Sequence, residues 1–141
     1  MEARDLALLN ARGRMAIGAS LVLVPRLIGP MWIGDAADRP VVKMMSRALG
    51  GRDLALGLGL AVALDRGKPV RGWLEGAALA DGADLAATLL AGDSIPRRQR
   101  RTVALVAAVS LVGCAVVARA LDPPPAEHEV FVTEAHLTGH P

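Results

Sequence analysis

The feature that most constrains this chain is an uncharged apolar run at residues 102–118, TVALVAAVSLVGCAVVA. Basic residues flank the run on both sides: Arg97, Arg98, Arg100 and Arg101 precede it, and Arg119 follows it. Extended to residue 121, it has about 20 residues, which form roughly 30 Å of helix and match the hydrocarbon core of a bilayer. We interpret the run as a transmembrane helix; the alternative is the buried core helix of a soluble bundle.

Three further apolar segments precede this run, at residues 5–34, 41–65 and 69–91. Pro25 and Pro30 should kink or break the first segment, because proline removes a helical hydrogen bond. The second segment begins after Asp38 and Pro40, a plausible cap followed by a first-turn proline. The sequence therefore predicts an all-α fold over residues 1–121, a four-helix transmembrane bundle with a kinked first helix.

The two ends of the chain are interpreted differently from this bundle. After Asp122 the sequence changes to PPPAEHEVFVTEAHLTGHP, and we predict a short, disordered, Pro-rich polar tail at 122–141. Residues 15–24 have the length of the apolar part of a secretory signal. Two acidic residues precede this stretch and no small-x-small cleavage site follows Pro25, so we retain it as part of the first helix.

Composition supports a membrane environment and excludes several other classes of protein. The chain is 52% hydrophobic but only 2% aromatic, which favours aliphatic helices packed closely in lipid. A net charge of +2, without a basic stripe interleaved with aromatic residues, argues against nucleic acid as a partner. The single cysteine, Cys114, excludes a disulfide within the chain and a cysteine-based zinc site. Only Lys43 and Lys68 are lysines among 16 basic residues, a usage typical of GC-rich bacteria, so we expect a multi-pass protein of a bacterial cell membrane.

Charges within the middle segments set an energetic problem for this interpretation. The leucines and valine of residues 54–64 contribute about −3 kcal/mol to membrane insertion, whereas one central charge costs about +2.5 to +3.5 kcal/mol. Arg52 and Asp53 would therefore cancel the gain of their own segment if they were unpaired in the bilayer. Either the segment does not cross the membrane, or these charges have partners.

An antiparallel hairpin of the second and third segments supplies the partners. Asp53 is then level with Asp81, Arg52 with Gly82, and Arg47 lies within about one turn of Asp84. We therefore predict an intramembrane polar cluster, whose members are Arg47, Arg52, Asp53, Asp81 and Asp84. An arginine fork can bridge such carboxylates, which is how buried charge is usually tolerated.

The predicted cluster has one negative charge in excess. Three compensating groups remain open: an arginine of the first segment (Arg12, Arg14 or Arg26), a proton on one aspartate, or a bound cation. Intramembrane ionisable residues commonly mark a proton, ion or ligand site. The alternative is a structural lattice of salt bridges, and the sequence leaves both interpretations open.

Small residues suggest how these helices approach each other. Residues 55, 59 and 63 of the second segment are Ala, Gly and Ala, and residues 72, 76 and 80 of the third are Gly, Gly and Ala. Such small-xxx-small faces allow close helix packing in lipid. They predict direct contact between the second and third helices.

The sequence shows no enzyme motif, and it indicates no catalytic residue, no cofactor and no metal. The three histidines, His128, His136 and His140, all lie in the tail, so no serine of the bundle has a histidine for a catalytic triad. Cys114 lies in the apolar fourth segment, where a thiolate is disfavoured, and is interpreted as a packing residue. The glycines at 50, 51, 57 and 59 do not complete a nucleotide-binding loop.

Two stretches, RALGGRDLALGLGLAVALDRG at 47–67 and ALADGADLAATLLAG at 78–92, resemble small four-helix integral membrane proteins of bacteria. The sequence is more loosely similar to the DoxX-like group, and Arg52 and Asp53 before a Gly-Leu alternation are the most recognisable element. The resemblance covers residues 5–121 and implies a four-helix membrane fold. Some DoxX-like proteins are quinone-linked redox subunits, which makes a redox-accessory role one alternative.

From the residues themselves we expect a small, non-enzymatic accessory or structural membrane subunit. Its partners are the lipid bilayer and either another membrane protein or a second copy. A small carrier or proton-linked transport protein that uses Asp81 and Asp84 is the main alternative. Basic residues are almost equally divided between the two predicted membrane faces, so the sequence does not set the orientation.

Overall fold

The computed structural model describes residues 2–121, apart from the side chains of Ile33, Asp35 and Ala36. The predicted tail at 122–141, with its three histidines, lies outside the described residues. Within the described part there are five α-helices and two short 3-10 helices and no strand, which confirms the predicted all-α class. In chain order these are α1 (Ala3–Leu23), α2 (Pro25–Ile33), η1 (Gly34–Asp38), α3 (Pro40–Asp65), α4 (Arg71–Leu90), η2 (Gly92–Ser94) and α5 (Arg97–Leu121).

The first predicted segment forms two helices rather than one kinked helix. The chain leaves helical geometry at Val24, with φ −129° and ψ 52°, and Pro25 is the first residue of α2. A residue before proline is driven out of the α region by contact with the proline ring, so α1 ends there. Pro30 lies inside α2 without ending it.

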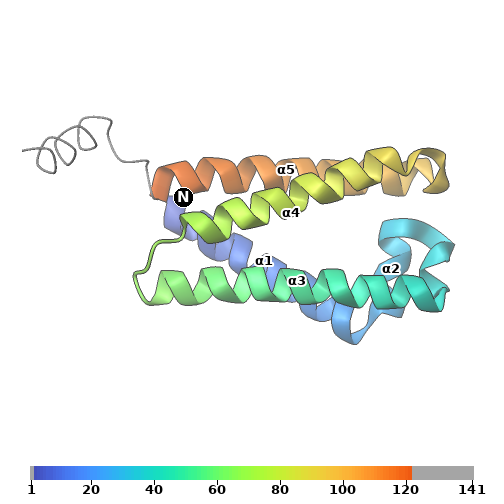
Figure 1. The fold of residues 1–141 in the computed structure, drawn as a ribbon, viewed down its shortest axis with the longest axis horizontal. Helices are drawn as coiled ribbons and strands as arrows, with labels where there is room; N and C mark the ends of the chain where they lie inside the picture. The colour runs from blue at the N-terminus through green and yellow to red at the C-terminus, as the bar shows by residue number, and fades with distance from the viewer. Residues whose placement is uncertain (1, 122–141) are drawn as a thin grey trace, which may run out of the picture.

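The four long helices form two pairs, α1 with α3 and α4 with α5 (Figure 1). The pairs approach each other where α1 begins and where the 66–70 loop joins α3 to α4. They diverge towards the other end, where α2 and η1 lie between them (Figure 1). We call these the closed end and the open end.

Glycine allows α1 and α3 to pack backbone against backbone. A methyl group added to Gly18 would lie 2.6 Å from the carbonyl oxygen of Gly50, and one added to Gly57 would lie 2.7 Å from that of Ala11. Real side chains are not found at such distances, so neither position accepts a larger residue without a shift of a helix. These glycines therefore set the crossing of the first pair.

The predicted contact between small-residue faces of α3 and α4 is not formed. Gly59 lies beneath the ring of Trp73, which separates the two backbones. Ala55 is exposed, and nothing lies close to the position of a Cβ on Gly72. The close approach is instead between α1 and α3, because an indole ring holds α4 away from α3 at this level.

Two helices, α1 and α5, are long and apolar enough to cross a membrane, rather than the four that the sequence predicts. Only 22% of each apolar stretch is buried inside the protein, whereas the core helix of a soluble protein is mostly buried. α1 also lies where a signal sequence would lie. α3 and α4 do not meet the same criterion of length and apolarity.

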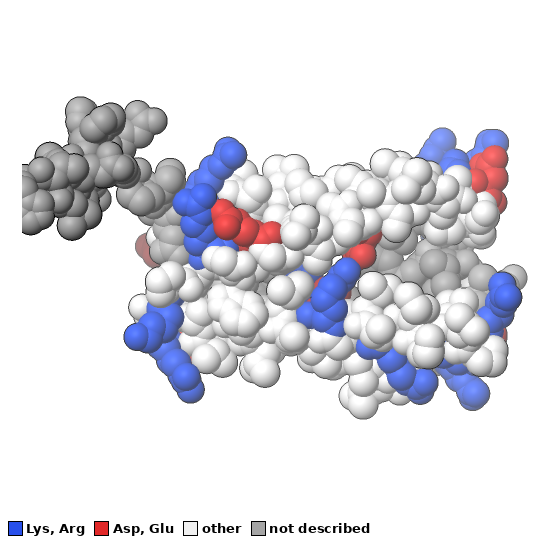
Figure 2. All heavy atoms as spheres, viewed as in Figure 1, with Lys and Arg blue, Asp and Glu red and all other residues white. Residues whose placement is uncertain are grey.

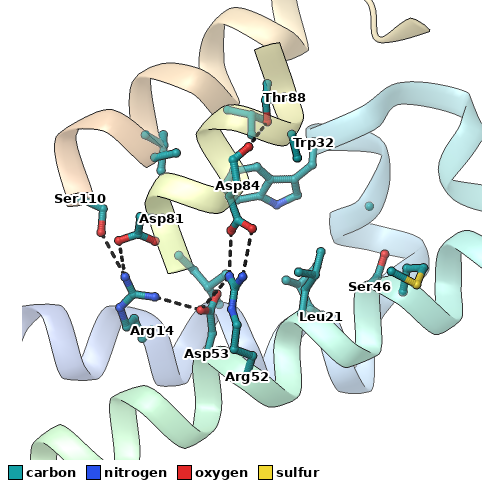
Figure 3. A pocket seen from close by; sticks show the side chains of 18 of the residues that line it. Arg14, Leu21, Trp32, Ser46, Arg52, Asp53, Asp81, Asp84, Thr88 and Ser110 are labelled. Carbon is teal, nitrogen blue, oxygen red and sulfur yellow. Dashed lines mark hydrogen bonds and ion pairs between the residues drawn. The ribbon is translucent and has the colours of Figure 1, made fainter. Parts of the chain in front are cut away.

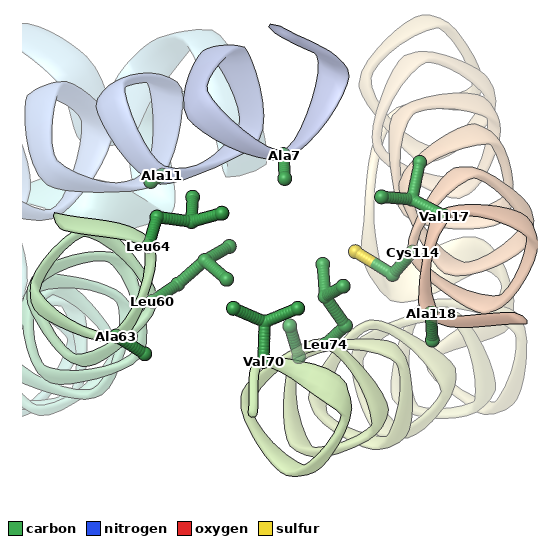
Figure 4. Close-up of a cluster of buried hydrophobic side chains, with 11 residues drawn as sticks. Ala7, Ala11, Leu60, Ala63, Leu64, Val70, Leu74, Cys114, Val117 and Ala118 are labelled. Carbon is green, nitrogen blue, oxygen red and sulfur yellow. The ribbon is translucent and has the colours of Figure 1, made fainter. Parts of the chain in front are cut away.

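The apolar core lies at the closed end, where all four long helices contribute to it (Figure 4). Leu60 of α3, Leu74 of α4 and Cys114 of α5 are its largest fully buried side chains. Ala7 and Ala11 complete it from α1. Most of the core residues are small, so the helices lie close together at this end. The next layer of the bundle is formed by longer polar side chains.

Candidate functional site

Arg14 carries the guanidinium at the centre of the bundle. It follows Ala7 and Ala11 on the buried face of α1 and is itself 6% exposed. Its Nη1 donates to Oδ1 of Asp53 on α3 at 2.9 Å, and its Nη2 contacts Oδ2 of Asp81 on α4. Nη2 also lies 3.4 Å from Oγ of Ser110 on α5, so one side chain links all four long helices (Figure 3).

Arg52 forms the second half of the site. Its two Nη atoms donate to the two carboxylate oxygens of Asp84 at 2.9 and 2.7 Å, a bidentate pair. Nη2 also lies 3.3 Å from Oδ1 of Asp53, which therefore accepts from both arginines (Figure 3). We call Arg14, Arg52, Asp53, Asp81 and Asp84 the Arg/Asp cluster.

Four of the five residues predicted for the cluster, Arg52, Asp53, Asp81 and Asp84, lie together, but Arg47 does not. Arg47 is exposed, and its Nε donates to the carbonyl oxygen of Val22 at 3.3 Å. It precedes Arg52 by five residues, which places it about 140° away around the helix. Depth along the hairpin predicted Arg47 within about one turn of Asp84, but its direction around α3 is wrong for contact.

Arg14 takes the place predicted for Arg47. The sequence named it only as one of three candidates in the first segment. A sharper signal was present, because Ala7, Ala11, Arg14 and Gly18 follow the spacing of one helix face, and all four are buried. Arg12 lies off this face and is exposed. Ser110 was not predicted for the cluster, and its position as a polar residue within the uncharged stretch of α5 is the signal that could have found it.

The cluster still carries one excess negative charge when each group has its ordinary charge. Two guanidinium groups face three carboxylates, and in residues 2–121 the ion pairs of these carboxylates involve only Arg14 and Arg52. The Nε atoms of both arginines are buried without a hydrogen-bond partner. Arg14 therefore replaces Arg47 without balancing the charge.

A cavity of about 310 Å³ adjoins the cluster on the side of the open end. Aspartates and arginines of the cluster form one end of it, and Trp32 of α2 and Thr88 of α4 lie close to Asp84 (Figure 3). The remaining walls are mainly aliphatic and come from both helix pairs, including Leu21, Val42, Leu49, Val103 and Val106. Volume and lining are those of a small-molecule site, with a few polar groups in an apolar pocket.

The bundle thus has three successive layers along its length. From the closed end to the open end these are the apolar core, the Arg/Asp cluster and the cavity. Helices α1, α3 and α4 contribute to all three in order, as α4 does with Leu74, then Asp81, then Thr88, and α5 reaches the middle layer through the contact of Ser110 with Arg14. Within the described residues, no group of histidine, cysteine and acidic side chains is arranged to hold a metal ion.

Comparisons with known proteins found no match: no family model, curated protein or solved structure matches the chain.

Proposed function

We propose that this chain is a small integral membrane protein in which α3 and α4 cross the bilayer together with α1 and α5. The observation that carries this proposal is that the charged side chains in the middle of α3 and α4 pair with one another and with Arg14. These two helices are not apolar enough to meet the criterion for a membrane span because they contain Arg52, Asp53, Asp81 and Asp84. All four of these side chains form ion pairs within the bundle. Each of these charges has an opposite charge as its partner, so none carries the full insertion cost of an isolated charge, although the side chains of Arg52 and Asp84 are 30% and 36% exposed.

The outer surface supports the same proposal. Large apolar side chains point outward from every long helix, among them Leu9, Leu58, Leu79 and Val109, each more than half exposed. Charged side chains gather at both ends of the molecule, and a basic and an acidic group also lie together in the middle of the visible face, surrounded by uncharged side chains (Figure 2). At about 1.5 Å of rise per residue, the shortest of the four helices, α4, spans roughly 30 Å.

In this proposal the Arg/Asp cluster joins the two helix pairs, and the protein acts as a non-enzymatic accessory or structural subunit of a membrane. The pairs share few other polar contacts, whereas Arg14 alone connects α1 to three other helices. Removal of one member leaves buried charge without a partner, which makes the cluster a strong constraint on one arrangement of the helices.

The structure also supports an orientation that the sequence left open. Arg14 is internal, and Arg26 and Arg47 lie beside Lys43 at the open end. Eight basic residues then belong to the open end, namely Arg26, Arg39, Lys43, Arg47, Arg97, Arg98, Arg100 and Arg101. Five belong to the closed end, namely Arg4, Arg66, Lys68, Arg71 and Arg119, while Arg12 lies near the midpoint of α1, at about the level of Arg14. By the positive-inside rule the open end faces the cytoplasm.

Membrane insertion is tested by alkaline carbonate extraction together with cysteine labelling. Single cysteines at Leu58 and Leu79, in a Cys114→Ala background, should resist a water-soluble maleimide because lipid covers these positions. Cysteines at Lys68 and Asp93, at the two ends, are the matched controls and should react once both faces are accessible. Release of the protein by carbonate, or labelling at 58 and 79 as fast as at the controls, would overturn the proposal.

A transport role is the second candidate, and the cavity beside Asp84 favours it. A proton-linked carrier would use Asp81 or Asp84 as the titrating group. The substitution Asp84→Asn separates the two roles: a carrier stays folded and loses transport, whereas a structural cluster loses stability because Arg52 keeps a buried charge without its partner.

A further inference from the structure

The cavity at the open end is not needed for the cluster to join the helices. The ion pairs of the cluster form without any group from the cavity. The cavity of about 310 Å³ lies on their open-end side, between the two helix pairs. A void of this size in a bundle with a closely packed opposite half loses packing contacts. An occupant of suitable chemistry would restore them.

The apolar walls indicate the larger part of that occupant. Leu21, Val42, Val103 and Val106 surround the space with aliphatic groups, and Trp32 adds an aromatic ring beside Asp84 (Figure 3). Such a surface offers hydrogen bonds only at the cluster and at a few hydroxyl groups. The walls therefore suit a hydrocarbon chain rather than a polar metabolite.

The cavity opens sideways, between the helix pairs, and not only along the axis of the bundle. Met45 and Leu49 of α3 and Ala87 of α4 line it and are themselves exposed on the outer surface. Its opening between α3 and α4 therefore lies on the surface that the proposed membrane location covers with lipid. A ligand dissolved in the bilayer could enter without crossing water.

The charge at the end of the cavity selects the head group of the ligand. The cluster has three carboxylates and two guanidinium groups, and Asp84 is the carboxylate with the most exposed side chain, at 36%. The two Nε–H groups that lack an acceptor are shielded, so they do not offer an anion a free donor in the cavity. A positive head group beside Asp84 would balance the charge and would lie near the face or edge of Trp32.

We propose that this cavity binds a lipophilic cation, a single aliphatic chain with an amine head group. The head lies beside Asp84 and Trp32, and the chain extends along the aliphatic walls towards the opening between α3 and α4. This inference rests on the proposed membrane location for the route of entry. The proposed function of the cluster, which is to join the two helix pairs, does not itself require a ligand, so the bound amine is an additional claim.

The test uses the full chain in phosphatidylcholine nanodiscs with the substitution Trp73→Phe, so that Trp32 is the remaining tryptophan. Decylamine with a nitroxide close to its amine end is the probe, so that the label of a bound molecule lies near Trp32, and quenching of Trp32 reports binding. Unlabelled decylamine, decanol and decanoate are the competitors at pH 7. Decylamine should compete at a concentration at least about ten-fold below that of decanol, and decanoate should be the weakest of the three.

Variants separate the head-group contact from the cavity and from partition into the lipid. Asp84→Asn should remove the preference for decylamine over decanol, while Asp93→Asn, an exposed aspartate at the same end, should leave it unchanged. Ala87→Phe fills the cavity without altering a charge and should abolish quenching, which keeps the test decisive if Asp84→Asn does not fold. An equal response to decylamine and decanol, a preference retained in Asp84→Asn, or quenching retained in Ala87→Phe sinks the proposal.

The proposed membrane location and the proposed binding of a lipophilic amine are tested by independent experiments, so either one can be wrong without the other. Carbonate extraction and cysteine labelling report whether lipid surrounds the helices. Head-group selectivity at Trp32, repeated with the protein in a neutral detergent, reports the cavity whether or not the chain spans a bilayer.

Discussion

Arg14 of α1 and Asp53 of α3 pair across an interface whose backbones are in contact on both sides of the pair. Gly18 meets Gly50 one turn further along α1, and Ala11 meets Gly57 about one turn before it. The two helices are antiparallel and their register is set by these glycines. The ion pair is therefore held by backbone packing, and not by long flexible side chains alone.

Loss of Arg14 should be the most damaging single change in the cluster. Arg14→Gln leaves Asp53 and Asp81 buried without their shared guanidinium, and we expect the free energy of unfolding to fall by about 3 to 5 kcal/mol. Arg12→Gln, an exposed arginine of the same helix, is the control and should change stability by less than about 0.5 kcal/mol. Cys114 is buried and is the single cysteine, so its rate of alkylation in increasing denaturant measures unfolding. Equal effects of the two substitutions would contradict a central role for Arg14.

The crossing of α1 and α3 should depend on the absence of a side chain at Gly18. Gly18→Ala places a methyl group against the carbonyl oxygen of Gly50, and we expect a loss of about 1 to 3 kcal/mol. Gly13→Ala is the matched control, since no atom lies within 4 Å of its Cβ position, and it should be neutral or stabilising. Denaturant unfolding followed by circular dichroism compares the two. A stable Gly18→Ala protein would show that the helices separate at little cost.

Arg47 and Arg52 should behave differently although the sequence places both near the cluster. Arg47→Ala removes an exposed arginine whose hydrogen bond joins one backbone carbonyl, so we expect little effect on unfolding. Arg52→Ala removes the bidentate partner of Asp84 and should be clearly destabilising. Arg52→Lys should restore only part of the loss, because lysine cannot form the two parallel hydrogen bonds. If Arg47→Ala is as damaging as Arg52→Ala, the arrangement of the cluster described here is wrong.

The proposed orientation makes a prediction about accessibility in intact cells. A cysteine at Asp93, at the open end, should be protected from a membrane-impermeant maleimide, whereas one at Lys68, at the closed end, should react. Permeabilised cells are the control, and both positions should then be labelled. The reverse pattern would contradict the orientation but would leave the membrane location intact.

The positions of the helices could be predicted closely from the sequence, because local features set them. The segments 41–65 and 69–91 correspond to α3 and α4 within a residue or two. Pro40 begins α3, as first-turn prolines do, and Pro25 marks the end of α1. What local features did not show is that Pro25 would divide the first segment completely, since proline permits either a kink or a break.

The cluster could be predicted only in part, for a geometric reason. Spacing along a hairpin gives the depth of each residue, and depth correctly brought Asp53 and Asp81 to one level, where both contact Arg14. It does not give the direction of a side chain around its helix relative to neighbours whose crossing is unknown. That crossing depends on backbone contacts such as Gly18 with Gly50, which no local pattern specifies.

By itself, the sequence determined that helices form, where prolines interrupt them, and that charges within apolar segments must find partners, because unpaired charge is costly away from water. Only the tertiary structure decided that Arg14 rather than Arg47 is the partner, and that a cavity lies beside the cluster. Both depend on how whole helices lie against each other. A pairing between residues distant in sequence follows from the sum of many packing contacts, of which each local segment contains only its own share.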